Sequence, residues 1–168
     1  NIDLYTVGVK DARLQRVTDH PETDTEPEWS PDGQQIAFVS DRTGLPQVYV
    51  ARRDGADPHR LTWEPDAYEG SPSWSPDGGR LAFVRRGFEG FDIYVTEVEG
   101  GVPLRLTEGD SNENPCWSPD GLQLVFCRTR EGRTDIWAMG ADGSNPRQLT
   151  SDGTSVLPSW SPRPPDDR

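Results

Sequence analysis

The chain has 168 residues and a formal net charge of −12, from 29 acidic and 17 basic side chains. This charge disfavours a nucleic-acid or anionic-lipid partner, because both require basic side chains opposite their phosphates. No apolar stretch approaches the roughly 18 residues that a membrane-spanning helix needs, so no membrane span is expected.

The chain opens on half of a repeated unit. Residues 2–7 and 14–18 are predicted strands, and the second strand ends in the pair Val17-Thr18. The same order, an aromatic strand followed by a short strand that ends in Leu-Thr, returns three times further along the chain. We therefore interpret residues 1–18 as a half blade of a larger repeat.

Three full units follow, at 26–62, 71–107 and 114–150, and each predicts four strands, named A to D in chain order. Strand A is short and ends at the Trp of a Trp-Ser-Pro-Asp-Gly sequence, whose Pro and Gly favour a tight turn. Strand B is a nearly continuous apolar run, which indicates burial on both faces. Strand C carries an aromatic residue, a glycine-containing turn follows, and strand D ends in Leu-Thr.

The chain then begins one further unit. Residues 157–162 repeat strand A and are predicted to be a closing strand, and a polar tail follows at 163–168. The tryptophans that mark the units recur at intervals of 45, 43 and 43 residues, and they are Trp29, Trp74, Trp117 and Trp160.

Antiparallel four-stranded units with a strand buried on both faces must stack against one another, and radial stacking produces a β-propeller. We predict an all-β propeller domain over residues 1–162, with about four blades, or an arc of a larger ring. Three blades would be complete and one would be split between the two termini. No 3.6-residue periodicity is present, so no helix is expected.

The order of these motifs resembles the blade of the TolB-like, WD-type β-propeller repeat family. It is also similar to blades in the non-catalytic propellers of dipeptidyl-peptidase-like and tricorn-like proteases. The resemblance covers nearly the whole chain. It implies a bacterial protein of the periplasm, or otherwise extracytoplasmic, that binds other proteins.

TolB-like propellers have six blades and a small α/β domain before them, and this sequence departs from that pattern in both respects. Three explanations stay open. The chain is a fragment of a longer protein, or a partial ring that a second copy completes by self-association, or a small ring with an incomplete closing blade.

The sequence offers little for catalysis. Its two histidines, His20 and His59, are expected on opposite faces of the ring, and no Gly-x-Ser-x-Gly, P-loop or His-Glu-x-x-His motif occurs. Cys116 and Cys127 show no metal-ligand spacing, so we expect two reduced side chains. We predict a protein that is not an enzyme and has no cofactor. Calcium suits oxygen-rich acidic loops, but no ligand spacing specifies a calcium site.

Partner binding is predicted in the loops that join strand D to the next strand A and strand B to strand C. The strand order places both sets of loops on one face, and loops held by a rigid fold are common binding sites. The alternative is that these loops are acidic only because the whole protein is acidic. The candidate partner-binding residues are Glu28, Asp66, Tyr68, Glu69, Phe88, Asn112 and Glu113.

The predicted function is therefore a non-catalytic propeller that binds a protein or peptide partner. Two alternatives stay open: the substrate-gating propeller of a larger serine peptidase, and a propeller that binds a sugar or another small ligand.

Overall fold

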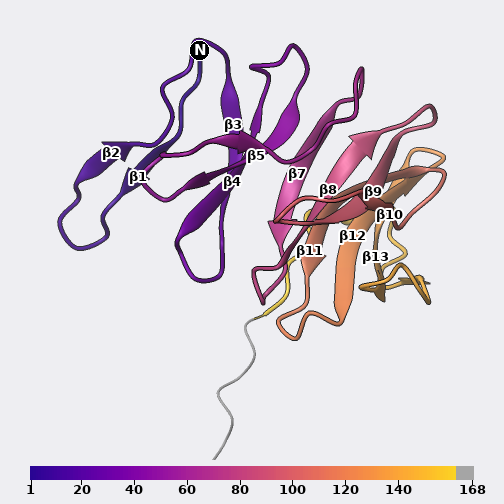
Figure 1. Cartoon of the computed structure of the whole chain (residues 1–168). Helices are drawn as coiled ribbons and strands as arrows, with labels where there is room; N and C mark the ends of the chain where they lie inside the picture. The colour runs from indigo at the N-terminus through magenta and orange to yellow at the C-terminus, as the bar shows by residue number, and fades with distance from the viewer. Residues whose placement is uncertain (162–168) are drawn as a thin grey trace, which may run out of the picture.

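In the computed structural model, which describes residues 1–161, fourteen strands form four antiparallel sheets (Figure 1). No helix occurs within these residues, and so none that could cross a membrane. The strands are β1 (Tyr5–Val7), β2 (Leu14–Arg16), β3 (Asp24–Trp29), β4 (Gln35–Ser40), β5 (Gln47–Arg52), β6 (His59–Arg60), β7 (Glu69–Trp74), β8 (Arg80–Arg86), β9 (Phe91–Glu97), β10 (Leu104–Arg105), β11 (Ser111–Trp117), β12 (Gln123–Arg130), β13 (Arg133–Gly140) and β14 (Arg147–Gln148).

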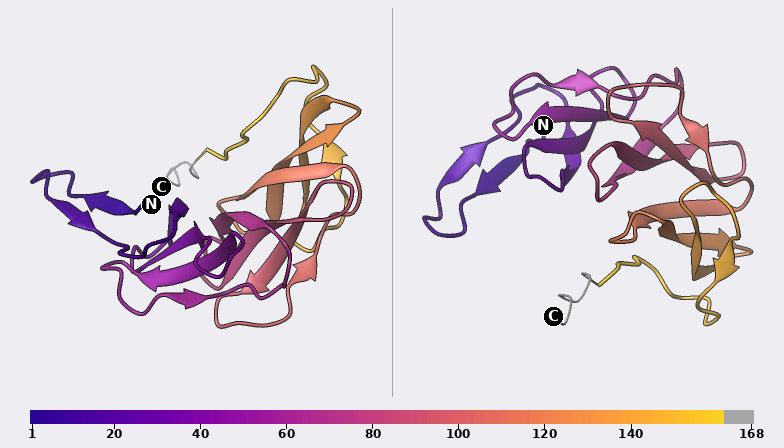
Figure 2. Two further views of the ribbon diagram at one scale, coloured as in Figure 1. Left: turned by 90° about the horizontal axis from the view of Figure 1, so that it is seen from above. Right: turned by 60° about the horizontal axis from the view of Figure 1, so that its bottom comes forward.

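Three sheets have four strands each, in the orders β3-β4-β5-β6, β7-β8-β9-β10 and β11-β12-β13-β14. Neighbouring strands in every sheet are consecutive in the chain and antiparallel, which confirms the predicted four-stranded blades. We call these sheets blades 1, 2 and 3. They stack side by side in a curved arc, with the two-stranded sheet β1–β2 at the N-terminal end (Figure 2).

The core lies between the blades, because strand B of each blade is covered on both faces. Phe38, Phe83 and Phe126 occupy equivalent positions in β4, β8 and β12 and are fully buried. Each burial stabilises the fold by roughly 2–3 kcal/mol. Separate apolar clusters join β1–β2 to blade 1, blade 1 to blade 2, and blade 2 to blade 3.

The Trp-Ser-Pro-Asp-Gly sequence forms the turn between strands A and B. In blade 1, the Ser30 hydroxyl donates to Asp32 Oδ1 at 2.6 Å and accepts the Gln35 N–H at 2.9 Å. Gly33 has φ +66°, in the left-handed region that glycine adopts without strain. The equivalent serine and aspartate side chains make the same bond in blades 2 and 3.

The Leu-Thr pairs attach strand D to the start of strand C. In blade 2, the Thr107 hydroxyl accepts the backbone N–H of Ile93 at 2.8 Å. Equivalent bonds occur in β1–β2, blade 1 and blade 3. The repeated threonine therefore satisfies a backbone donor that the short strand D does not reach.

The β1–β2 sheet and residues 157–161 form no common sheet in the part of the chain that the structure describes. Residues 157–161 form no strand and lie against blade 3, where the Trp160 indole donates to the backbone carbonyl of Cys116 at 3.2 Å. No hydrogen bond joins these residues to β1–β2 within 1–161. A blade shared by 1–18 and 157–162 stays a prediction, and residue 162 and the polar tail lie outside the described residues.

Candidate functional site

The loops predicted to bind a partner do lie on one face of the arc. The start of strand A pairs with the end of strand B in every blade, as Glu69 does with Arg85. The D-to-A and B-to-C loops therefore meet at the top of Figure 1, and the Ser-Pro-Asp-Gly turns lie at the bottom. We call these two surfaces the loop face and the turn face.

An arginine is fixed beneath the loop face of each blade. In blade 1, Arg42 bonds Asp24 at 2.9 Å, and in blade 2, Arg85 bonds Glu69 at 2.7 Å. Both carboxylates are fully buried at the start of strand A. Each guanidinium also lies over the aromatic rings of strands B and C, with Arg85 4.4 Å from the Tyr94 ring centre. Charge pairing and ring stacking together hold the loop ends rigid.

Blade 3 has the same arginine but a neutral partner. The Arg128 Nε donates to Asn112 Oδ1 at 2.8 Å, and its guanidinium lies over Phe126 and Trp137. Desolvation lowers the pKa of Arg128, although the charges of Asp110 and Asp92 oppose that shift.

Two of the predicted contact residues differ from the prediction. Glu69 and Asn112 were assigned to the D-to-A loops, but both lie in strand A and their side chains are fully buried, where they hold Arg85 and Arg128. Desolvation raises the pKa of Glu69, against the opposing effect of its bonds to Thr62 and Arg85. In this structure neither residue presents an atom to a partner.

The remaining candidates fall into two groups. Phe88 is fully exposed at the tip of the B-to-C loop of blade 2, and Asp66 is exposed in the preceding D-to-A loop. Tyr68 is half-buried against the edge of Phe91, with ring centres 5.5 Å apart. Glu113 is half-buried and accepts a hydrogen bond from Ser111 at 2.8 Å. These residues lie near the loop face.

Glu28 lies apart from them, on the inside of the arc. It is half-buried, and its carboxylate accepts the backbone N–H of Trp74 at 3.1 Å from the next blade. Desolvation raises the pKa of Glu28 to about 7, although the Trp74 hydrogen bond opposes that shift. Glu28 also lines a pocket together with Cys116 of blade 3. Its hydrogen bond to Trp74 connects strand A of blade 1 with strand A of blade 2.

The inner strands all carry a bulge at an X-Pro pair. The pairing register shifts between Thr25 and Glu28 in β3, and at the equivalent places in β7 and β11. A residue with positive φ precedes a proline at each position, and sequence reasoning missed this backbone feature. The three pairs are Glu26-Pro27, Ser71-Pro72 and Asn114-Pro115, and Leu157 before Pro158 also has a positive φ although residues 157–161 form no strand.

Both cysteines are free thiols, and Cys127 is the more deeply buried. Burial raises the pKa of Cys116 and of Cys127, which disfavours the reactive thiolate. Within residues 1–161 no group of three or more His, Cys, Asp or Glu side chains is arranged to hold a metal ion.

The loop face of blade 1 contains a pocket that sequence reasoning identified only in part. Trp63 is 70% exposed in its wall, and the Arg60 guanidinium lies 4.9 Å from the ring centre. Leu45, Glu64 and Asp66 complete an apolar and acidic rim. The available signal was that Trp63 follows a Leu-Thr pair, where the other units have Asp, Glu or Ser.

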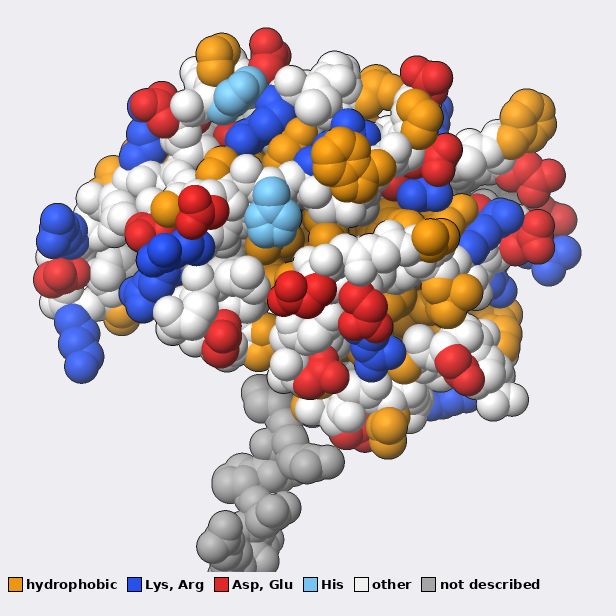
Figure 3. Space-filling model, in the orientation of Figure 1, with side chains coloured by type: hydrophobic (Ala, Val, Ile, Leu, Met, Phe, Trp, Pro, Cys, Tyr) orange, Lys and Arg blue, Asp and Glu red, His pale blue; other side chains and the backbone are white. Residues whose placement is uncertain are grey.

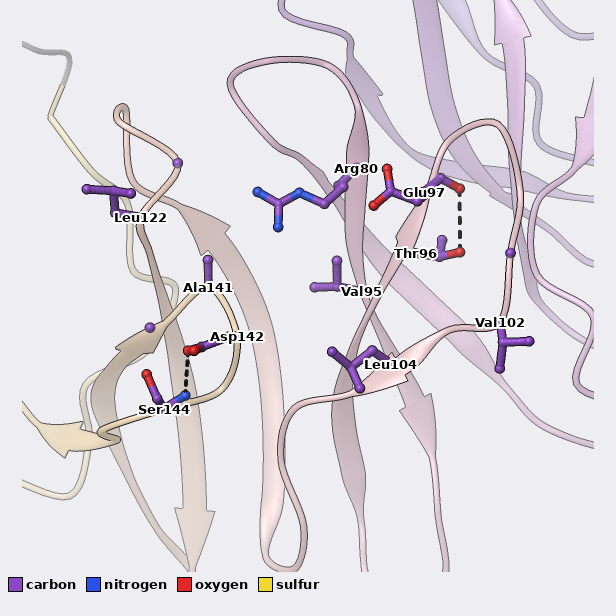
Figure 4. Close-up of a pocket in the computed structure, with 13 residues that line it drawn as sticks. Arg80, Val95, Thr96, Glu97, Val102, Leu104, Leu122, Ala141, Asp142 and Ser144 are labelled. Carbon is purple, nitrogen blue, oxygen red and sulfur yellow. Dashed lines mark hydrogen bonds between the residues drawn. The ribbon is translucent and has the colours of Figure 1, made fainter.

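A larger pocket lies between the outer strands of blades 2 and 3. Val95, Leu104 and Arg80 lie on one side of it, and Leu122 and Ala141 lie on the other (Figure 4). Exposed apolar side chains appear in a hollow over β8–β10, among side chains of both charges (Figure 3). The Ser-Pro-Asp-Gly and Asp-Gly turns that line this pocket place it toward the turn face.

Comparison with known proteins agrees with the geometry. The family described as the TolB beta propeller domain matches residues 1–164. The Tol-Pal system protein TolB of Bordetella pertussis is 48% identical over 46 residues, which are 27% of this chain and 10% of that protein.

Solved structures match over more of the chain. A crystal structure of TolB from Acinetobacter baumannii has a TM-score of 0.85 and 28% identity, over 96% of this chain and 41% of that one. A putative TolB from Agrobacterium tumefaciens has a TM-score of 0.67 and 24% identity, over 87% of this chain and 68% of that one, and shows the fold alone. The chain thus spans a tenth of the curated relative and less than half of the Acinetobacter protein. The chain belongs to the TolB β-propeller domain family.

Proposed function

We propose that this chain is a non-catalytic propeller segment that binds a protein or peptide partner through its loop face, in the periplasm or another extracytoplasmic compartment. The observation that carries the proposal is the pair of exposed aromatic side chains, Trp63 and Phe88, on loops anchored by the arginine pairs of blades 1 and 2.

Exposed aromatic side chains on a rigid surface are effective anchors, because they bury a large apolar area and lose little conformational freedom. Trp63 and Phe88 both lie on the loop face, and acidic residues surround Trp63. Glu64 and Asp66 would attract a basic side chain of the partner beside the aromatic contact. The preferred partner surface is therefore apolar at its centre and basic at its edge.

The relatives support a partner of the same kind. The Bordetella protein is named a Tol-Pal system protein, so a protein component of such a system is the partner class that we propose. Because the chain spans only part of its relatives, we restrict the proposal to the loop face and do not extend it to the activity of a whole relative.

The test is site-specific photo-crosslinking in the full-length protein within its native cell envelope. A crosslinking amino acid replaces Phe88 or Asp66 on the loop face, and Gln34 on the turn face as the matched control. We expect a discrete crosslinked protein from the two loop-face positions and none from position 34. Crosslinks from position 34 alone would overturn the proposed docking face.

A further inference from the structure

Blade 3 departs from blades 1 and 2 at the residue that begins strand A. Asp24 and Glu69 provide a buried carboxylate to their arginines, whereas Asn112 provides only an amide oxygen. Arg128 is therefore half-buried and has no carboxylate bonded directly to it within residues 1–161.

The neighbours of Asn112 explain why an amide occupies this position. Its Nδ2 donates to the backbone carbonyl of Gly109 at 2.7 Å and faces Asp92 Oδ1 at 3.5 Å. A carboxylate here would meet two acceptors, while Asp92 is already paired with Arg105 at 2.7 Å. The packing of blade 3 against blade 2 thus favours a neutral partner for Arg128.

Arg128 lines a pocket of about 400 Å³ at the loop end of blade 3, which we call the Arg128 pocket. Its guanidinium lies 4.5 Å from the ring centre of Trp137, and the only hydrogen bond that it makes within residues 1–161 comes from Nε. In blade 2, by contrast, an Nη1 atom of Arg85 bonds Glu64 at 3.2 Å. The terminal nitrogens of Arg128 remain available to a ligand.

Two more guanidinium groups line the same pocket. Arg130 and Arg133 pair across the end of the β12–β13 hairpin, and both are exposed. Arg133 bonds the Ser151 carbonyl at 3.2 Å, and none of the three arginines forms an ion pair within residues 1–161.

Acidic residues in the wall restrict the charge of the ligand. Asp135 is already bonded to Gln148 and Thr150, but Asp110 and Glu131 lie at the rim. With Asp135 they offset the formal charges of the three arginines, so the lining as a whole gives a dianion such as phosphate no electrostatic advantage over a monoanion. The planar, singly charged carboxylate accepts two parallel hydrogen bonds from a guanidinium fork and carries the lower charge.

We propose that the Arg128 pocket is a binding site for a carboxylate group, held by Arg128 and by the rim arginines Arg130 and Arg133. This site does not depend on the docking of a protein at the loop face. It takes its ligand from any molecule that presents a free carboxylate of suitable size, such as an organic acid or a peptide terminus.

The test is NMR titration of the full chain with N-acetylglycine, at constant ionic strength maintained with chloride. The reporters are the Nε–H of Arg128 and the indole N–H of Trp137. We expect saturable shifts of both signals in the millimolar range, and none with N-acetylglycinamide, which lacks the charge. Equal shifts with the amide, or tighter binding of inorganic phosphate, would overturn the assignment.

Variants distinguish carboxylate binding in the Arg128 pocket from nonspecific binding of carboxylates to exposed arginines. Arg130→Ala with Arg133→Ala is expected to weaken N-acetylglycine binding about tenfold, because two charged contacts are lost. Arg86→Ala, at an exposed arginine that ends β8 in blade 2, is the matched control and should leave the affinity unchanged. Equal losses in the two variants would contradict the proposal.

Asn112→Asp tests the origin of the free charge, since it places a carboxylate beside Arg128 as Asp24 lies beside Arg42. We expect a loss of N-acetylglycine binding of about tenfold or more in a chain that still gives a dispersed spectrum. Unchanged affinity in a folded Asn112→Asp variant would overturn the role of Arg128. If this variant does not fold, the Arg130 and Arg133 variants decide the question.

Discussion

The indole nitrogen of Trp117 donates a hydrogen bond to the backbone carbonyl of Ser73, 3.1 Å away and in the neighbouring blade. Trp74 and Trp160 make the equivalent bond to the blade before them. The tryptophan that marks each repeat is thus the residue that joins consecutive inner strands. Trp29, at the N-terminal end of the arc, makes no such bond within residues 1–161 and is 46% exposed.

This difference predicts unequal effects of the same substitution. Trp117→Phe should lower the free energy of unfolding by about 1 kcal/mol, because it removes the indole hydrogen bond that joins blade 3 to the Ser73 carbonyl of blade 2. Trp29→Phe is the matched control and should change stability by less than about 0.5 kcal/mol. Urea unfolding of both variants makes the comparison, and equal losses would show that the indole bond contributes nothing.

The ion pair between Arg85 and Glu69 in blade 2 predicts that two substitutions of Glu69 lower the free energy of unfolding to different extents. Glu69→Ala should destabilise the fold by about 2 kcal/mol, because it leaves the largely buried Arg85 with only the partly exposed Glu64 as a carboxylate partner. Glu69→Gln should cost less, since an amide still accepts from Arg85 Nε as Asn112 does from Arg128. Urea unfolding measures both variants, with Glu99→Ala as an exposed control. Similar losses for alanine and glutamine would show that the hydrogen bond kept by glutamine contributes nothing once the charge is lost.

Glu28 predicts a pH dependence of stability. Its pKa of about 7 in the folded chain lies above its usual value of 4.5, so the folded state favours the protonated carboxyl. The resulting stability is complete below about pH 4.5 and is lost as the pH rises through 7. Glu28→Gln removes that loss, so at pH 8 the variant should be more stable than the parent by roughly 2–3 kcal/mol.

The measurement is thermal or urea unfolding of parent and Glu28→Gln between pH 4 and pH 8. The two curves should meet near pH 4 and separate as the pH rises. Glu89→Gln, at an exposed loop residue, should follow the parent throughout. A constant difference between parent and Glu28→Gln at every pH would remove ionisation as the cause.

The proposed loop face predicts that affinity and stability can be separated. Trp63→Ala and Phe88→Ala should leave the unfolding free energy within about 0.5 kcal/mol of the parent, because both side chains are exposed. Each should weaken capture of the crosslinked partner by about tenfold or more. Val102→Ala, on an exposed side chain lining the turn-face pocket, is the control and should leave capture unchanged.

Much of the fold could be predicted because the same sequence motifs occur in every unit and each motif indicates the same structural element. The Trp-Ser-Pro-Asp-Gly turns, the apolar strand B and the Leu-Thr pairs each correspond to an observed element with a specific hydrogen-bonding role. A strand that is buried on both faces requires its sheet to pack between two neighbouring sheets. The side-by-side packing of the blades could therefore be predicted from local sequence patterns.

The site was predicted less well, because burial of a polar side chain depends on its neighbours in space. Glu69 and Asn112 begin strand A in sequence terms and so resembled loop residues, but an arginine from strand B draws them inward. The signal was present: a polar residue stands five positions before the tryptophan in each full unit. The raised pKa of Glu28 had no such signal, since the adjacent blade creates its environment.

The bulged X-Pro pairs of β3, β7 and β11 limit how another polypeptide can bind to the inside of the arc. Each strand A is the edge of its blade, and an exposed edge normally offers a row of amides to which another strand can add. Pro27, Pro72 and Pro115 remove one donor from each edge, and the bulge bends the neighbouring backbone away from a straight ladder. The interior therefore resists β-augmentation and amyloid-like pairing, and a molecule that enters there must be recognised by side chains.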